Sequence, residues 1–575
     1  MHKKILISLL LSAAALGATP QDLHKEITVE RTVQPDLRDA FRLGGIAPEI
    51  TMPPITTQVL RPAEYTDAGA LTSEAATLPP APWADSIPMS PYRGYISAGY
   101  LPMYNAAGSG GLELIRRPTA RLGIWAQADA FSYTGDIPYS TDVRLGSIVG
   151  QGGLDGSFRL PDKSVVTCAL RGMAATIRTP YSYYGQNLPR TSAYYQRALS
   201  IGAFLGWEKQ FGNISGSLGV GWENFRFMHN LPATVATNYT AADEKLWTIN
   251  GALGLTDEYT ATRWLGINID WNVLSSNVFP NQWHTAPCTV TEGHIRPYLN
   301  FDSDAVHGSV GLNVSVATGH DDGGMKIAPE ANIACDVTDS FVLWAKATGG
   351  ETLNPLSSVF RISQYVTPLR SYDRTNVPFD IRGGFNYGPS SGFSIEVNGG
   401  YAKVRNMLTP LVTIYSNGYF SSRFTGTDFG CWYVGGRVSY AYGQLFTLAL
   451  GVKTGSSDNK VNSWYEWYDG AKTRFDASLK VYPVDNLDVE LAYIMATGRK
   501  GITDVYPYGS ISSQVQRYIS NLGNIGSLNL NASYKINRNF TAFLALDNIL
   551  AKQYLLVSGM PARKLGGLIG IACKF

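Results

Sequence analysis

The chain has 575 residues, 16% of them charged, and a formal net charge of +2. A balance this close to neutral excludes the strongly basic surface by which proteins bind nucleic acid. After the N-terminal leader there is no run of about 18 or more apolar residues, which excludes a helical membrane span. The mean hydropathy of −0.07 still permits a transmembrane β-barrel, because polar lumen-facing positions alternate with lipid-facing ones along each strand.

Residues 1–18 have the pattern of a secretory signal peptide. Lys3 and Lys4 make a basic start, residues 5–16 are apolar, and Gly17 and Ala18 offer the small side chains of a cleavage site. We therefore expect the chain to be exported from the cytoplasm.

Residues 19–91 form a proline-rich N-terminal segment, in which Pro53 is followed by Pro54 and Pro79 by Pro80. Proline lacks the amide donor that a sheet ladder needs. We expect this segment to have little regular structure and to lie in the periplasm or in the lumen of a barrel.

From residue 92 onward one unit recurs: an alternating strand, a tight turn, a second alternating strand and a longer loop. Residues 528–536 and 540–546 carry apolar side chains at every second position, with the turn Asn537-Arg538-Asn539 between them. Two strands for each such turn, with an opening and a closing strand, give about 22 strands. The sequence predicts an all-β fold over residues 92–575: a transmembrane antiparallel β-barrel with long extracellular loops and short periplasmic turns.

Soluble β-sandwiches and propellers also contain alternating strands. The long strands with one consistently apolar face favour the membrane barrel, and so does the final strand, residues 564–575, which ends on an aromatic residue. Phe575 is the predicted assembly signal for the barrel-assembly machinery. The predicted location is the outer membrane, with its lipids against the apolar face.

Two stretches resemble the barrel of TonB-dependent receptors. One is residues 547–554 (DNILAKQY) together with the closing strand after them, and the other is residues 328–355. The resemblance implies an outer-membrane transport or receptor protein. A count of about 22 strands is also typical of transporters whose lumen is plugged.

Receptors of this family carry a folded plug domain before the barrel, and residues 19–91 are too few for one. The sequence therefore predicts a barrel without a complete plug. Glu26, Ile27, Thr28 and Val29 resemble the family's energy-coupling box. That resemblance implies TonB as a partner.

Charges of both signs fall on the predicted lumen face of the strands. Two interpretations stay open: a polar conduit with a ligand preference, or inward charges that simply pair with one another away from lipid. The candidate lumen charges are Asp129, Arg171, Arg382, Glu396, Arg437 and Lys480.

Aromatic residues gather in two predicted outer loops. They are candidates for contacts with a ligand or partner protein, although tyrosine and tryptophan also form the girdles of a barrel at the membrane interface. The candidates are Tyr183, Tyr184, Trp464, Tyr465, Trp467 and Tyr468.

Catalytic chemistry has no sequence support. There is no HExxH, P-loop or dinucleotide fingerprint, so we expect neither an enzyme nor a bound cofactor or metal. The 5 cysteines show no CxxC spacing. Cys288 and Cys431 fall in or near predicted loops, and a disulfide between them is left open.

Two functions follow from this sequence. The first is a transport or ligand-receptor component similar to a TonB-dependent receptor. The second is a plugless structural or assembly scaffold that works with a surface lipoprotein or another partner. They differ in whether the lumen conducts.

Overall fold

The computed structural model describes residues 92–101, 105–137, 140–179, 194–229, 241–256, 263–277, 288–319, 323–366, 372–414, 420–459, 471–506, 515–557 and 560–575. All of them belong to the unit Val59–Phe575. The predicted signal peptide, the proline-rich segment and the candidate coupling box lie outside these residues. Within the described ranges, no helix has the length and apolar character that a membrane crossing requires.

The described chain is almost entirely β-strand. Its one described helix is α2 (Leu356–Ile362). The strands are β1 (Gly94–Leu101), β2 (Asn105–Arg117), β3 (Ala120–Ile137), β4 (Ser140–Arg159), β5 (Val165–Thr179), β6 (Tyr194–Phe211), β7 (Ile214–His229), β8 (Ala241–Thr256), β9 (Arg263–Ser276), β10 (Cys288–Asp302), β11 (Val306–Thr318), β12 (Gly324–Thr338), β13 (Phe341–Asn354), β14 (Tyr372–Ser390), β15 (Phe393–Ile414), β16 (Phe420–Tyr442), β17 (Phe446–Ser457), β18 (Thr473–Val484), β19 (Leu487–Thr497), β20 (Lys500–Val505), β21 (Gln516–Asn521), β22 (Ile525–Lys535), β23 (Phe540–Asp547), β24 (Leu555–Val557), β25 (Met560–Pro561) and β26 (Gly566–Lys574).

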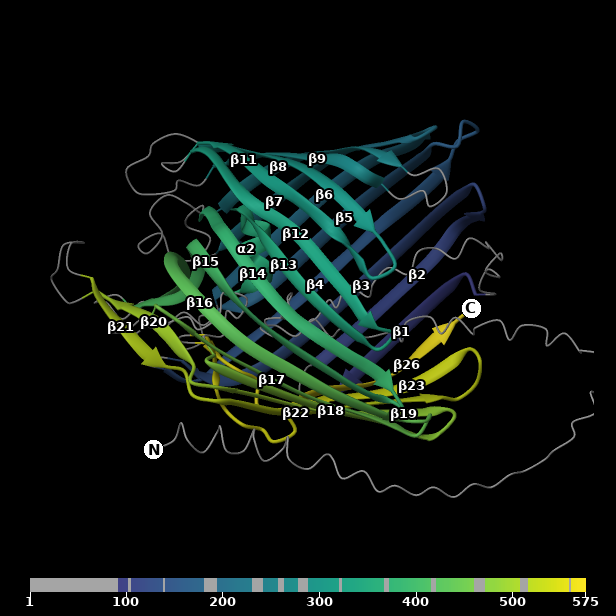
Figure 1. Ribbon diagram of the computed structural model, residues 1–575. Helices are drawn as coiled ribbons and strands as arrows, with labels where there is room; N and C mark the ends of the chain where they lie inside the picture. Colours follow the sequence, from purple (N-terminus) through teal and green to yellow (C-terminus); the bar gives the residue numbers. More distant parts are fainter. Residues whose placement is uncertain are drawn as a thin grey trace, which may run out of the picture. The chain divides into compact units, whose positions relative to one another are not determined.

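Twenty-two of these strands form one closed antiparallel ring (Figure 1). Strands β1 to β19 follow one another in chain order, then β22, β23 and β26 complete the ring. The ring closes where the first strand, β1, pairs antiparallel with the last strand, β26. This pairing runs from Tyr95 opposite Lys574 to Tyr100 opposite Ile569. The prediction of an all-β barrel of about 22 strands is confirmed.

The two faces of the ring differ as the two-residue period requires. On β26, Ile569 and Ile571 are 59% and 54% exposed, whereas Leu568 and Ala572, which flank them, are buried. Large exposed apolar side chains recur at every second position on other strands too, as Leu199 and Ile201 do on β6, so that face is the outer one. The opposite face lines the interior of the ring, which we call the lumen.

The two ends of the ring are built differently. At the short-turn end, where β1 begins and β26 stops, tight turns join the strands, for example residues 118–119 and 161–164. At the opposite end, here the long-loop end, β13 leads into α2 before the chain returns as β14. The sequence predicted this alternation of short and long connections but not the helix.

One connection at the long-loop end is shorter than the long outer loops that the sequence predicts. Strand β15 continues to Ile414 and β16 starts at Phe420, and the two stay paired beyond a register shift between Val404 and Met407. Asn406 lies in this shift with φ of 52°, a conformation that Asn tolerates better than most residues. The hairpin β20–β21 then adds to the free edge of β15 in parallel, which covers an edge that would otherwise stay unpaired.

Candidate functional site: the long-loop end of the lumen

The segment after β13 folds across the lumen, and we call residues 355–366 the bridge. Pro355 precedes α2 with φ of −64°, and no side chain caps this helix of 7 residues. A helix this short is marginal in isolation, so its stability comes from the packing of Leu356, Val359 and Phe360, which are all buried.

The bridge packs on the inner face of β7. Phe360 lies with its ring centroid 5.8 Å from that of Phe225 and 5.5 Å from that of Phe227. Leu218 and Val220 of the same strand are exposed and have the opposite parity. The two phenylalanines therefore point inward, and the bridge lies inside the ring.

The same apolar cluster reaches the far wall of the lumen. Leu408 and Val412 of β15 and Phe424 of β16 belong to it. Strands β8–β15 separate β7 from β16 along the ring, a path of about 40 Å at the usual strand spacing. Strands this far apart along the ring can share one cluster only through the lumen, and Leu356, Val359 and Phe360 of the bridge belong to that cluster.

Two carboxylates of the wall hold the start of the bridge. The Leu356 amide donates a hydrogen bond to Glu244 Oε2 at 2.5 Å, and the Leu353 amide donates to Glu292 Oε2 at 3.2 Å. Both glutamates are almost fully buried. Leaving a buried amide without its acceptor costs about 1–3 kcal/mol, so these contacts fix where the chain leaves β13.

Glu292 also belongs to a polar network on the inner wall. His294 Nε2 is 3.2 Å from Glu292 Oε1, and His294 Nδ1 is 3.1 Å from Asn313 Oδ1. Beside them, Lys326 hydrogen-bonds Glu351, and the Arg374 guanidinium is 3.9 Å from the same carboxylate. Buried charges that pair in this way rigidify their surroundings.

A second segment also folds inward: residues 548–565 before β26, which we call the last loop. Arg499 is fully buried and donates to the carbonyls of Leu555 and Leu556, both at 2.6 Å. The Tyr133 hydroxyl of β3 donates to Pro561 O at 2.9 Å. Met560 belongs to the same apolar cluster as the bridge, so the two inward segments share one packed core inside the ring.

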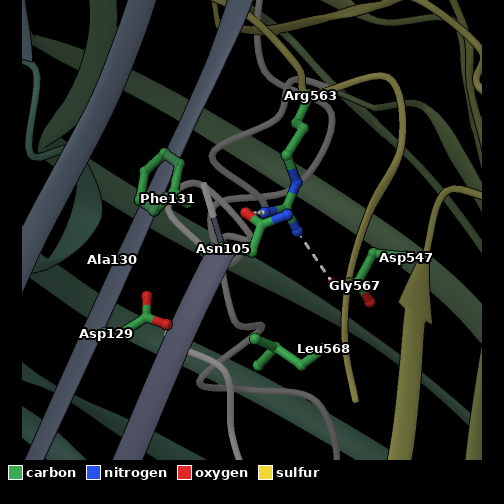
Figure 2. Close-up of a pocket in the computed structure, with 8 residues that line it drawn as sticks. All are labelled: Asn105, Asp129, Ala130, Phe131, Asp547, Arg563, Gly567 and Leu568. Atoms are coloured by element: carbon green, nitrogen blue, oxygen red, sulfur yellow. Dashed lines mark hydrogen bonds and ion pairs between the residues drawn. The ribbon is translucent and has the colours of Figure 1, made fainter. Parts of the chain in front are cut away.

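Under the last loop lies a small recess, drawn in Figure 2. Arg563 donates to Asn105 Oδ1 at 2.7 Å and lies 3.1 Å from Asp547 Oδ2, and its guanidinium carbon is 6.0 Å from the centroid of the Phe131 ring. Asp129 lines the same recess. This group ties β23 to β2 across the seam of the ring.

Five of the six candidate lumen charges interact with a polar neighbour. The pairs are Arg171 with Asp155 at 3.6 Å, Arg437 with Asp476 at 3.8 Å, Lys480 with Glu490 at 3.8 Å, Arg382 with Asp380, and Glu396 with Asn398 at 2.9 Å. The sixth, Asp129, lies in the recess. This pattern favours charges that pair with one another over a row of unpaired charges that selects a ligand.

The other candidates divide into those with a described position and those without. The Phe575 carbonyl accepts from the Arg93 and Gly94 amides at 2.7 and 2.9 Å, so the last residue is tied to the first strand. Cys431 lies buried within β16, not near a loop, and the Cys288 side chain lies outside the described part. The candidate aromatic residues, Tyr183, Tyr184, Trp464, Tyr465, Trp467 and Tyr468, also lie outside it.

The sequence did not reveal the residues that hold the bridge and the last loop inside the ring. One usable signal was present: Phe225 and Phe227 are large apolar side chains at the inward parity of β7, where a polar side chain is expected. Glu244, Glu292 and Arg499 gave no such signal, because a charged inward residue is ordinary in a barrel.

Comparisons with known proteins complete the description. Neither a protein-family model nor a curated protein matches the sequence. Among solved structures, the FrpB iron transporter of Neisseria meningitidis (F3-3 variant) is similar with a TM-score of 0.62 and 11% identity, over 84% of this chain and 81% of that one.

Two further structures match equally well. The siderophore receptor PirA of Acinetobacter baumannii gives a TM-score of 0.60 at 11% identity, covering 84% of this chain and 80% of its own. A ferric enterobactin receptor (PfeA) mutant of Pseudomonas aeruginosa in complex with enterobactin gives 0.62 at 11%, over 84% and 81%. The described chain is therefore a 22-strand β-barrel whose fold matches that of TonB-dependent siderophore and iron receptors.

Proposed function

We propose that this protein is an outer-membrane transport or ligand-receptor barrel whose lumen is closed at the long-loop end by its own bridge and last loop. The observation that carries the proposal is the apolar cluster around Phe360, which joins β7 to β15 and β16 through the lumen. The similar structures include an iron transporter and siderophore receptors, so chelated iron is the first class of ligand to test.

In this proposal the bridge does what a folded plug domain does in TonB-dependent receptors. A ligand or a partner opens the path by drawing Phe360 away from Phe225 and Phe227. Energy for that step comes from TonB acting at residues 26–29. The wall carboxylates Glu244 and Glu292 hold the closed position, since Glu244 accepts the Leu356 amide at the start of the bridge and Glu292 accepts the Leu353 amide at the end of β13 just before it.

The scaffold function remains the second proposal, and one observation favours it. Arg499, Arg563 and the paired inward charges make a dense set of buried contacts around the closure. A barrel that only presents its outer loops to a surface lipoprotein has no need to conduct, and such contacts suit a permanently closed lumen.

Conductance in planar lipid bilayers separates the two proposals. The full-length protein is compared with a variant in which residues 356–362 are replaced by a Gly-Ser linker of equal length. For a transporter we expect the wild-type protein to show no conductance and the linker variant to show stable large openings. We also expect cells whose protein lacks residues 24–30 to lose uptake of ferric siderophores. A variant as closed as the wild type, with normal uptake after the 24–30 deletion, contradicts the transport proposal and leaves the scaffold.

A further inference from the structure

A glutamate and a histidine of β10 share a buried contact beside the start of the bridge. Glu292 is 1% exposed and His294 is 9% exposed, and Nε2 of His294 lies 3.2 Å from Oε1 of Glu292. The other carboxylate oxygen, Oε2, accepts the Leu353 amide. The pair is therefore in contact with the segment from which the bridge starts.

The orientation of Asn313 decides which nitrogen of His294 carries hydrogen. Nδ2 of Asn313 donates to the Gly349 carbonyl at 2.9 Å, so the atom that faces His294 Nδ1, at 3.1 Å, is the oxygen Oδ1. An amide oxygen only accepts, so Nδ1 is the donor. A neutral ring would then turn the lone pair of Nε2 toward Oε1 of Glu292. This contact is favourable only when the pair holds one further proton, on the ring or on the carboxyl group.

The other charged side chains around the pair are committed to one another. Those on β9, β10, β12, β13 and β14 form two groups: Asp270 with Arg296, and Glu351 with Lys326 and Arg374. Strand β11 contributes the uncharged Asn313 and Ser315. Among the described residues, Oε1 of Glu292 has no other hydrogen-bonding partner than the ring of His294. Loss of the shared proton would therefore leave a buried carboxylate without compensation, which is unfavourable.

We propose that Glu292 and His294 form a proton-dependent latch, which keeps the start of the bridge against the wall while the pair holds its shared proton. An arrangement in which water reaches Glu292 does not need that proton. Because the closed arrangement binds it, closure loses stability as the pH rises, and the opening equilibrium increases by at most about tenfold per pH unit. The latch rests on the proposed function, since it stabilises the closed lumen described there.

The experiment is hydrogen–deuterium exchange of the full-length protein in detergent, measured in peptides that contain the Leu353 and Leu356 amides. Glu292→Gln keeps an acceptor oxygen for the Leu353 amide and has no charge at any pH. Dividing the wild-type rate by the rate of this variant at the same pH removes the ordinary pH dependence of exchange. We expect the ratio to rise at least about tenfold between about pH 6 and about pH 9, a range in which a histidine pair loses its proton.

His307→Gln is the matched control, because His307 pairs with Asp336 at 3.5 Å and both side chains are 41% exposed. Water compensates that pair when it loses a proton, so this variant should show the wild-type pH response. Heat-modifiable migration on gels checks that each variant is folded.

A ratio that stays constant with pH overturns the latch, and so does a pH response that His307→Gln abolishes. Wild-type protection that stays constant after correction for the exchange rate of unstructured peptides also overturns it, without any variant. A rising ratio in a protein that never conducts supports the latch and counts against transport alone, because exchange is measured without conduction.

Discussion

Phe227 of β7 and Phe360 of α2 meet edge to face inside the barrel, with ring centroids 5.5 Å apart and ring planes at 85°. Both side chains are almost fully buried, although each belongs to a segment that faces the lumen. This one contact joins the wall to the bridge, and its removal is the most direct way to loosen the closure.

Replacing Phe360 with alanine should open the long-loop end. Truncating a buried phenylalanine typically lowers stability by about 3–5 kcal/mol. Here the truncation weakens the packing of the bridge and leaves the strand pairing of the ring unchanged. We expect more frequent openings in single-channel records at unchanged barrel stability. Leu205→Ala, on the outer face at 58% exposure, is the control, and equal opening by both variants would argue against a gating role of the bridge.

Glu244→Ala should release the start of the bridge, because the Leu356 amide loses its acceptor. An unsatisfied buried donor costs about 1–3 kcal/mol. The readout is the rate of maleimide labelling of Ser357→Cys, a buried position in α2. Labelling of the native cysteines, measured in the protein without this substitution, is subtracted. Labelling should accelerate in Glu244→Ala and remain slow in Glu244→Gln, which retains an acceptor oxygen. If both variants label at the parent rate, this contact does not hold the bridge.

Arg499→Met should free the last loop, since the arginine donates to the Leu555 and Leu556 carbonyls at 2.6 Å each. Each hydrogen bond from a charged donor contributes about 1.5–3 kcal/mol. Trypsin should then cut at Lys552 faster than in the parent chain. Arg517→Met serves as control, because Arg517 pairs with Asp504 within the hairpin β20–β21. An unchanged cleavage rate at Lys552 would assign the loop's position to other contacts.

Gly570→Val should prevent closure of the ring. A Cβ atom at Gly570 would lie 2.2 Å from Ala98 O and 2.7 Å from Gly99 Cα, and backbone atoms on a neighbouring strand cannot yield as a flexible side chain does. We expect little heat-modifiable barrel on gels. Gly150→Ala, whose Cβ meets nothing closer than 4.0 Å, should assemble normally. A fully folded Gly570→Val protein would mean that the seam tolerates separation.

The ring could be predicted because the alternation of side chains that marks each strand is a local pattern in the sequence. A period of two residues and tight turns can be recognised from consecutive positions, so the number of strands and the single apolar face of each strand followed directly. The closure could not be predicted in the same way. Phe227, Phe360 and Met560 lie far apart in the sequence, and only the curvature of the ring brings them together.

The sequence could predict which charged side chains point into the lumen, but not which partners they contact. Parity identified inward charges such as Arg171 and Asp129, but it cannot say which charge meets a partner across the lumen. Glu244 looks like any other inward carboxylate until the Leu356 amide reaches it. The helix α2 was missed because seven residues between a proline and a serine are too few to show a helical period.

The hydrogen bonds between Gly94 and Phe575 have a consequence for how this barrel can be rebuilt. Its first and last strands end side by side, so a short linker after Phe575 can lead directly into Tyr92 while the chain is cut at the turn of residues 161–164. Such a circular permutant keeps every strand neighbour and buries the original terminus in a new turn. It therefore tests whether the predicted assembly signal at Phe575 is needed at the end of the chain, or whether a sheet that closes is sufficient.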